Sequence, residues 1–413
     1  MEVAVPQQSI VSPAGLQRRL GLPLLVLYGT GVTVGAGIYV LIGAVAGHAG
    51  AYAPWAFALA AFVMAFTAAS YAELATRYPV SAGEAAYVRA AFESRLLSTL
   101  VGALRLATGI VAAAAVTLGG AGYIKQLIDW PAPWIAISMV VALGAVASWG
   151  ILESVLLAGV LTVIETGGLV WIVVSAVHSG VSFGPALLGP PPPDLSILSG
   201  ISFAGLLAFF AFVGFEDLAN VVEEAKNPRR SIPWAMALTL LITTVLYVLI
   251  AAIAVSAVPP AVLAASPAPL SLVFNAVAHI SPSTFSAIAI VSTLNTILAQ
   301  MTMTARVVYG MAEQGDLPRI LGRVHPRTGT PLLATGLVVL AVGALALSFP
   351  LERLAEGTSL VTLTIFAVVN LCLLRIRLRR SGSEAGQLRV PLWVPALGLM
   401  TCLLMIVSAF VAP

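Results

Sequence analysis

The chain has 413 residues, of which 60% are hydrophobic and only 9% are charged, and its mean hydropathy is +1.02. These values lie far outside the range of a soluble domain and predict a protein that crosses the lipid bilayer many times. The net charge of +3 does not indicate nucleic-acid binding, because the basic residues lie in loops between apolar segments, where they set the orientation of the chain. Cys372 and Cys402 both fall within apolar segments, so neither a disulfide framework nor a zinc site is predicted.

Apolar runs of about 20 residues predict eleven transmembrane helices. They lie near residues 22–48, 53–76, 97–121, 132–149, 154–177, 201–222, 233–257, 283–311, 331–349, 358–374 and 393–411. If the N-terminus is inside, the outside loops hold only Lys125 and Arg353, and the other basic residues between spans are cytoplasmic. This asymmetry predicts a multi-pass protein of the cytoplasmic membrane with its N-terminus inside and its C-terminus outside.

Two of the predicted spans contain glycine where an uninterrupted apolar helix is expected. Four of the eleven residues in Gly29–Tyr39 are glycines, and Phe209–Asp217 is an apolar run in which one glycine precedes an aromatic residue and two acids. Glycine is a poor helix former, and unwound backbone at membrane depth is tolerated only where it is buried or lines a cavity. We expect the first span to break between Val34 and Gly37 and to resume near Ile38. The alternative is that these glycines only let helices pack closely.

The two ends of a broken helix have opposite chemistry. The half that ends presents free carbonyls, and the half that begins presents free N–H groups at the positive end of its dipole. These groups complement the ammonium and the carboxylate of an α-amino acid. Two interrupted spans in corresponding halves of a chain also indicate a transporter built from inverted repeats, with its site near the membrane midplane.

Proline-rich segments mark two predicted outside connections. The run Gly189–Asp194 contains four prolines and predicts an extended linker between the repeats. The segment 258–282 is longer than a tight connection needs and is a candidate lid. The predicted organisation is a cytoplasmic N-terminal segment (1–21), a first five-helix repeat (22–178), an extracytoplasmic linker (179–200), a second repeat (201–374), a basic cytoplasmic loop (375–392) and an eleventh transmembrane helix (393–413).

Four stretches in the right order resemble the amino acid-polyamine-organocation superfamily of secondary transporters. They are Gly29–Tyr39 (GTGVTVGAGIY), Pro79–Tyr87 (PVSAGEAAY), Phe209–Asp217 (FFAFVGFED) followed by Glu223–Pro233 (EEAKNPRRSIP), and Arg306–Ala312 (RVVYGMA) with Gly315–Pro318 (GDLP). The resemblance covers nearly the whole chain. It implies an all-α fold of two inverted five-helix repeats (LeuT-like) with discontinuous helices 1 and 6, and transport by alternating access. Many relatives have a twelfth span that this chain lacks, so either a monomer or a homodimer is expected.

The resemblance also implies roles for residues at the two breaks. Amides around Gly35, Ala36 and Gly37 would hold a substrate carboxylate, and carbonyls near Thr33, Val34, Phe210, Ala211 and Val213 would hold the ammonium. The expected substrate-binding set is Thr33, Val34, Gly35, Ala36, Gly37, Ile38, Phe210, Ala211, Val213, Gly214 and Phe215, with Phe210 closing over the substrate. Glu216 matches the acid that the family uses as a gate or relay, and Asp217, about 100° further around an ideal helix, is the alternative relay.

Glu165 lies about midway along the fifth predicted span. In a prokaryotic subset of the superfamily a lysine in this helix serves as the coupling cation. The resemblance implies that Glu165 occupies the position of that lysine. An acid at the centre of a membrane helix costs about 2.5–3.5 kcal/mol, which favours the neutral form and suits it to take up and release a proton. Proton symport is the expected coupling, with exchange as the alternative. The alternative for Glu165 is a neutral acid that hydrogen-bonds a neighbouring helix.

The expected pocket is mostly apolar, with Phe210, Phe215 and Ala112–Ala115, and this favours neutral or hydrophobic amino acids. If Glu165 or Glu216 faces the substrate side chain, a cationic amino acid or polyamine is the better interpretation. Sodium is the alternative coupling ion, since Thr166, Thr293 and Thr296 offer oxygens, although a sodium site needs about six that converge. No cofactor and no resident metal are expected.

Other functions have less support in the sequence. The four histidines fall at helix ends or in loops, and no HExxH, phosphate-loop or Gly-x-Ser-x-Gly motif occurs, so an enzyme is not predicted. A transport-like membrane sensor or partner subunit would have the same sequence features as a transporter. It is the alternative from another functional class. Four acids at cytoplasmic helix ends are expected to be solvated caps or partners in loop ion pairs: Glu73, Glu153, Glu223 and Glu224.

Overall fold

The computed structural model describes residues 18, 20–79, 83–149, 155–379 and 388–411, and within them the chain is almost entirely helical. The first half contains α1 (Leu22–Thr33), α2 (Ala36–Ala49), η1 (Gly50–Tyr52), α3 (Ala53–Arg77), α4 (Gly83–Phe92), α5 (Arg95–Lys125), α6 (Ala132–Trp149), α7 (Val155–Ser179) and α8 (Gly184–Leu188). The second half contains α9 (Leu195–Phe212), η2 (Phe215–Ala219), η3 (Val222–Glu224), α10 (Pro228–Ala257), α11 (Pro260–Ala265), α12 (Pro269–Ala278), α13 (Pro282–Glu313), η4 (Arg319–Gly322), α14 (Leu332–Ser348), α15 (Leu351–Arg379) and α16 (Trp393–Val411).

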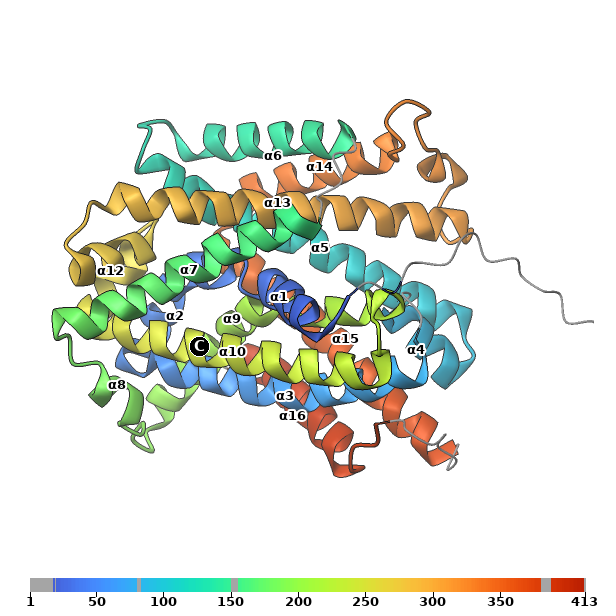
Figure 1. The fold of residues 1–413 in the computed structure, drawn as a ribbon, viewed down its shortest axis with the longest axis horizontal. Coiled ribbons are helices and arrows are strands. Elements are labelled where there is room, and N and C mark those ends of the chain that lie inside the picture. Colours follow the sequence, from blue (N-terminus) through green and yellow to red (C-terminus); the bar gives the residue numbers. More distant parts are fainter. Residues whose placement is uncertain (1–17, 19, 80–82, 150–154, 380–387, 412–413) are drawn as a thin grey trace, which may run out of the picture.

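The long helices run along the long axis of the molecule, with α8 and α12 near one end and α4 near the other (Figure 1). Two groups of helices pack side by side. In the first group α3 contacts both α9 and α10, α1 lies against α10, and α2 lies against α9. In the second group α5, α6, α13 and α14 pack together. Helix α15 contacts both groups and also packs against α16. The broken helices therefore belong to the first group and face α5 and α13 of the second.

Nine helical stretches among the described residues are long and apolar enough, by length and composition, to cross a membrane. The all-helical, polytopic architecture is confirmed. The predicted count was higher because α1 and α14 are short by this criterion, at 12 and 17 residues, and because α2 and α3 form one stretch, Ala36–Arg77. Eleven crossings and the two inverted repeats stay predictions. Several predicted boundaries are wrong by a few residues, since α9 begins at Leu195 and not near 201, α10 begins at Pro228 and not near 233, and α15 begins at Leu351 and not near 358.

Both predicted helix breaks are present, and the first lies slightly earlier than expected. α1 ends at Thr33 and α2 begins at Ala36, so the expected restart near Ile38 is wrong. The second break follows Phe212, and Gly214 there has φ +125°, a conformation that residues with a Cβ rarely adopt. The chain continues from Gly214 as the short 3-10 helix η2. Each break therefore leaves two free backbone ends inside the molecule.

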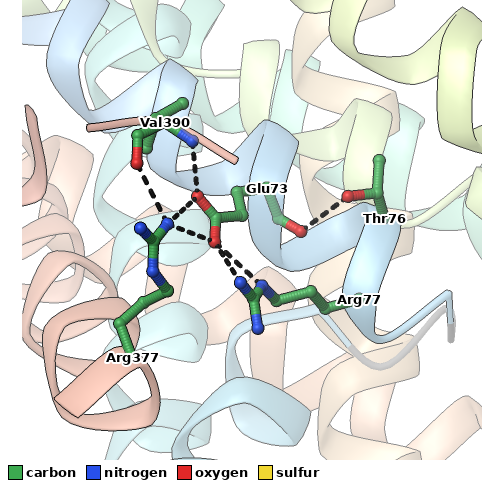
Figure 2. Close-up of polar contacts among 5 residues, drawn as sticks. All are labelled: Glu73, Thr76, Arg77, Arg377 and Val390. Carbon is green, nitrogen blue, oxygen red and sulfur yellow. Dashed lines mark hydrogen bonds and ion pairs between the residues drawn. The ribbon is translucent and has the colours of Figure 1, made fainter. Parts of the chain in front are cut away.

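Glu73, at the end of α3, is completely buried, so the expectation of a solvated cap is wrong for this residue. Its carboxylate accepts from Arg77 Nε at 2.8 Å, from Arg377 Nη1 at 2.9 Å and from the Val390 amide at 2.8 Å (Figure 2). The expected ion pairing is present, but it fastens three segments together: α3, α15 and the stretch before α16. Glu153 lies outside the described residues.

Glu73→Gln should destabilise the protein. The substitution leaves two arginines, each with a side chain less than one-tenth exposed, around a neutral amide, and breaking a buried ion pair costs on the order of 3 kcal/mol. Thermal unfolding of the purified protein in detergent should show a lower midpoint for this variant. Glu93→Gln, at an exposed position, is the matched control and should not shift the midpoint. Equal midpoints for both variants would contradict a structural role for the buried carboxylate.

Candidate functional site

A small cavity of about 20 Å³ lies where the two breaks meet. Its lining comes from α1, α2, α5, α9 and α13 and carries no charged side chain among the described residues. The lining residues are Val32, Thr33, Gly35, Ala36, Gly37, Ala112, Val116, Phe210, Ala211, Val213, Thr296 and Gln300. Seven members of the expected substrate-binding set are thus brought together at this cavity, whereas Val34, Ile38, Gly214 and Phe215 lie outside its lining.

The start of α2 lies very close to α9 and α13. A Cβ atom added to Gly37 would lie 2.6 Å from the Cα of Ala211, and one added to Gly35 would lie 2.7 Å from Oγ1 of Thr296. The Ala36 amide donates a hydrogen bond to Thr296 Oγ1 at 3.1 Å. The close approach fits the interpretation that these glycines allow tight packing, and Gly35 and Gly37 also line the cavity, as the substrate-binding interpretation expects.

The carbonyl ends of α1 and α9 share one hydrogen-bond donor. The hydroxyl of Tyr247, on α10, lies 2.7 Å from the Thr33 carbonyl oxygen and 3.0 Å from that of Ala211. The Val213 amide donates to the Phe210 carbonyl at 3.1 Å. Three of the carbonyls expected to hold an ammonium thus accept hydrogen bonds from the protein itself. The sequence carries no signal for Tyr247, since a tyrosine in an apolar helix is ordinary.

Phe215 lies away from the cavity. Its ring packs edge-on against Tyr71 and Phe366, with ring centroids 5.8 and 5.6 Å apart, and the side chain is fully buried. The turn at Gly214 sends the chain into η2, and this directs Phe215 into the aromatic cluster. Phe210, which precedes the break, lines the cavity as expected.

Glu216 and Asp217 are both buried and both pair with Arg105 of α5. Arg105 Nη1 donates to Glu216 Oε1 at 2.9 Å, and Nη2 donates to Asp217 Oδ1. The second oxygen of Glu216 accepts the Gly214 amide at 2.8 Å, so this carboxylate caps the broken end of its own helix. Sequence reasoning missed Arg105, although a lone arginine within an apolar span is a signal that a carboxylate lies nearby.

A larger cavity of about 670 Å³ adjoins the small one and shares Val32, Thr296 and Gln300 with it. Arg105 and Asp217 line it. It extends toward α4 and the end of α13, where the exposed residues Arg306 and Gln314 line it. The small cavity is therefore approached from one side of the molecule, past the Arg105 ion pairs.

Glu165 of α7 is completely buried and lines neither cavity. Its Oε1 accepts from Asn295 Nδ2 of α13 at 3.1 Å, and its backbone carbonyl accepts from the Tyr39 hydroxyl of α2 at 2.6 Å. Thr162, one turn earlier, is the residue that touches α1, because a Cβ on Gly31 would lie 1.9 Å from its hydroxyl oxygen. Glu165 thus sits between α2, α7 and α13 behind the cavity wall.

No group of three or more His, Cys, Asp or Glu residues that could hold a metal ion occurs among the described residues. Of the threonines considered as sodium ligands, Thr296 lines the cavity, while the Thr293 hydroxyl donates to the Ile290 carbonyl at 2.9 Å.

Comparison with known proteins places the chain among transporters. Residues 20–413 match the family described as amino acid permease. The chain is 29% identical to a branched-chain amino acid permease of Bacillus subtilis, over 95% of this chain and 88% of the relative. It is 33% identical to an uncharacterized transporter of Mycobacterium tuberculosis, over 97% of this chain and 88% of the relative. It is 30% identical to the vacuolar cationic amino acid transporter 4 of Arabidopsis thaliana, over 88% of this chain and 64% of the relative.

The match to the family spans nearly the whole chain and includes both broken helices and the cavity between them. The resemblance seen in the sequence is therefore confirmed: the chain is a multi-pass membrane protein that belongs to the amino acid permease family of the amino acid-polyamine-organocation superfamily.

Proposed function

We propose that this protein is a secondary active transporter that moves neutral or hydrophobic amino acids across the cytoplasmic membrane by alternating access, in symport with protons. The observation that carries the proposal is the cavity between two broken helices, which offers backbone groups for an amino acid and no charged side chain. Membership of the permease family supports the transport of amino acids.

The walls of the cavity favour a neutral side chain. Ala112, Val116 and Phe210 are apolar, and the polar side chains of Thr296 and Gln300 are uncharged. Glu216 does not line the cavity, and its two oxygens already accept from Arg105 and the Gly214 amide. A cationic side chain would bury its charge there without a carboxylate partner, which is costly. The branched-chain permease of Bacillus subtilis fits this interpretation, whereas the cationic transporters of Arabidopsis thaliana support the alternative of a cationic substrate.

The two ends of the molecule differ in a way that suits alternating access. At one end the segment 258–282 packs tightly on the bundle, since a Cβ on Gly43 would lie 2.6 Å from the Leu263 carbonyl and one on Gly122 would lie 2.2 Å from the Pro267 carbonyl. At the other end the large cavity reaches the exposed residues Arg306 and Gln314. With basic loops inside, this conformation would face the cytoplasm, and the lid would close the outside. Arg105 and its two acids would then form the inner gate.

Glu165 is the proposed proton site. It is buried at the junction of α2, α7 and α13, and the neutral amide of Asn295 contacts its carboxyl group. The Tyr39 hydroxyl of α2 donates to the backbone carbonyl of Glu165. A shift of Glu165 on a change of its protonation would therefore act on α2. α2 begins at the cavity, so the proton and the substrate would bias the same helix. Amino acid exchange without net proton movement is the alternative mode.

Uptake into proteoliposomes tests the function and the coupling together. Labelled amino acids should accumulate when an inward proton gradient is imposed on the wild type. Glu165→Gln should lose the gradient-driven accumulation but keep substrate binding, because Glu165 lies outside the cavity lining. Glu93→Gln, a surface control, should behave as the wild type.

Each other outcome has a meaning. An unchanged pH dependence in Glu165→Gln would remove Glu165 from the mechanism. Accumulation driven only by sodium, or only by preloaded amino acid, would replace proton symport with the corresponding mode. No accumulation under any of these gradients would favour a sensor or partner subunit over a transporter.

Gly37→Ala should slow transport strongly by forcing α2 and α9 apart at the cavity. The added methyl group would collide with the backbone of Ala211 at the cavity, and a displacement there of about 1 Å would reduce the uptake rate at least tenfold. Gly167→Ala is the matched control, since no atom lies within 4 Å of a Cβ at that helical position. Uptake by both variants should be measured at equal amounts of folded protein. Equal rates would show that the close approach at Gly37 is not needed.

A further inference from the structure

The Tyr247 hydroxyl joins the two broken helices at their carbonyl ends. Thr33 is the last residue of α1, and Ala211 lies one residue before the end of α9. Both residues line the small cavity, and both of their carbonyl oxygens lie within hydrogen-bond distance of the same phenol oxygen, at 2.7 and 3.0 Å. Tyr247 comes from a third helix, α10, and is fully buried.

The breaks explain why these carbonyls need an outside donor. In a continuous helix the Thr33 carbonyl would accept from residue 37, and the Ala211 carbonyl would accept from residue 215. Gly37 and Phe215 both follow a break, so both carbonyls lose their helical partners. A carbonyl left without a donor at membrane depth is unfavourable, and the Tyr247 hydroxyl relieves this.

One proton cannot serve both acceptors at once. A tyrosine hydroxyl has a single hydrogen to donate. When the hydroxyl hydrogen points at one of the two carbonyls, the other carbonyl receives only a weak hydrogen bond from Tyr247, or no hydrogen bond at all. An α-ammonium group carries three N–H donors, so it supplies what the pair of carbonyls lacks.

We propose that Tyr247 is a positioning residue of the ammonium subsite. Its hydroxyl holds the carbonyl ends of α1 and α9 at a fixed separation and turns toward one of them while the substrate ammonium donates to the other. The inference deepens the proposed function and rests on it, because it presupposes that an amino acid binds at the small cavity, which would have to widen to admit it.

The surroundings of Tyr247 fix the position of its hydroxyl. The ring packs edge-on against Phe57 and Phe212, with centroids 5.8 and 4.9 Å apart. Tyr247→Phe therefore keeps the packing of the ring and removes only the oxygen and its proton. Tyr123→Phe is a matched control from α5: Tyr123 is also fully buried, and its hydroxyl donates to the Tyr39 carbonyl at 2.6 Å, away from the cavity lining.

Three probes separate positioning of the ammonium from a general structural effect. Leucine has both charged groups, leucine amide keeps the ammonium but lacks the carboxylate, and 4-methylpentanoate keeps the carboxylate but lacks the ammonium. Their affinities are measured by competition with a labelled neutral amino acid on the purified protein. Thermal unfolding of each variant serves as a check on folding.

Tyr247→Phe should weaken the binding of leucine and of leucine amide by about tenfold, the loss expected when a hydrogen bond that positions the ammonium-binding carbonyls is removed. Tyr247→Phe should leave the affinity for 4-methylpentanoate unchanged. Tyr123→Phe should leave the affinities for all three probes unchanged. Equal weakening of all three probes, or of none, would overturn the assignment of Tyr247 while the proposed function stands. Failure of the wild type to bind any amino acid would overturn the proposed function and this inference together.

Discussion

The free backbone ends at the two helix breaks are the constraint on which the rest of the site depends. An unpaired amide or carbonyl in the membrane interior costs several kcal/mol, so a break persists only if side chains replace the lost helical bonds. Three such replacements are present. The Thr296 hydroxyl accepts the Ala36 amide, the Glu216 carboxylate accepts the Gly214 amide, and the Tyr247 hydroxyl serves the carbonyls of Thr33 and Ala211. The cavity lies among these replacements.

The replacements come from different groups of helices, and this matters for a transport cycle. Tyr247 belongs to α10, which lies in one group with α1, α3 and α9, so it would move together with the ends that it joins. Thr296 belongs to α13 of the other group and bonds the first amide of α2 across the cavity. A substrate carboxylate would seek the same amide as the threonine hydroxyl. The substrate carboxylate and the Thr296 hydroxyl would therefore compete for this amide at the boundary between the two groups of helices. Such competition would supply the differential contact that a conformational change requires.

The sequence predicted most of the architecture because apolar length and glycine content report directly on spans and breaks. Both breaks lie where the glycines indicated, and Gly35, Ala36, Gly37 and Phe210 meet at one cavity. The partners from distant helices could not be predicted. Tyr247 and Thr296 have no local pattern that distinguishes them from ordinary residues of apolar helices.

Errors in prediction arose where a side chain depends on the exact course of the backbone. The first restart was placed at Ile38, although Thr296 already caps the helix at Ala36. Phe215 was assigned to the pocket, but the turn at Gly214 carries it into contact with Tyr71 and Phe366. Buried acids show the same dependence on partners that are distant in sequence: Glu73 is surrounded by two arginines, Glu216 shares one arginine with Asp217, and Glu165 meets the neutral amide of Asn295.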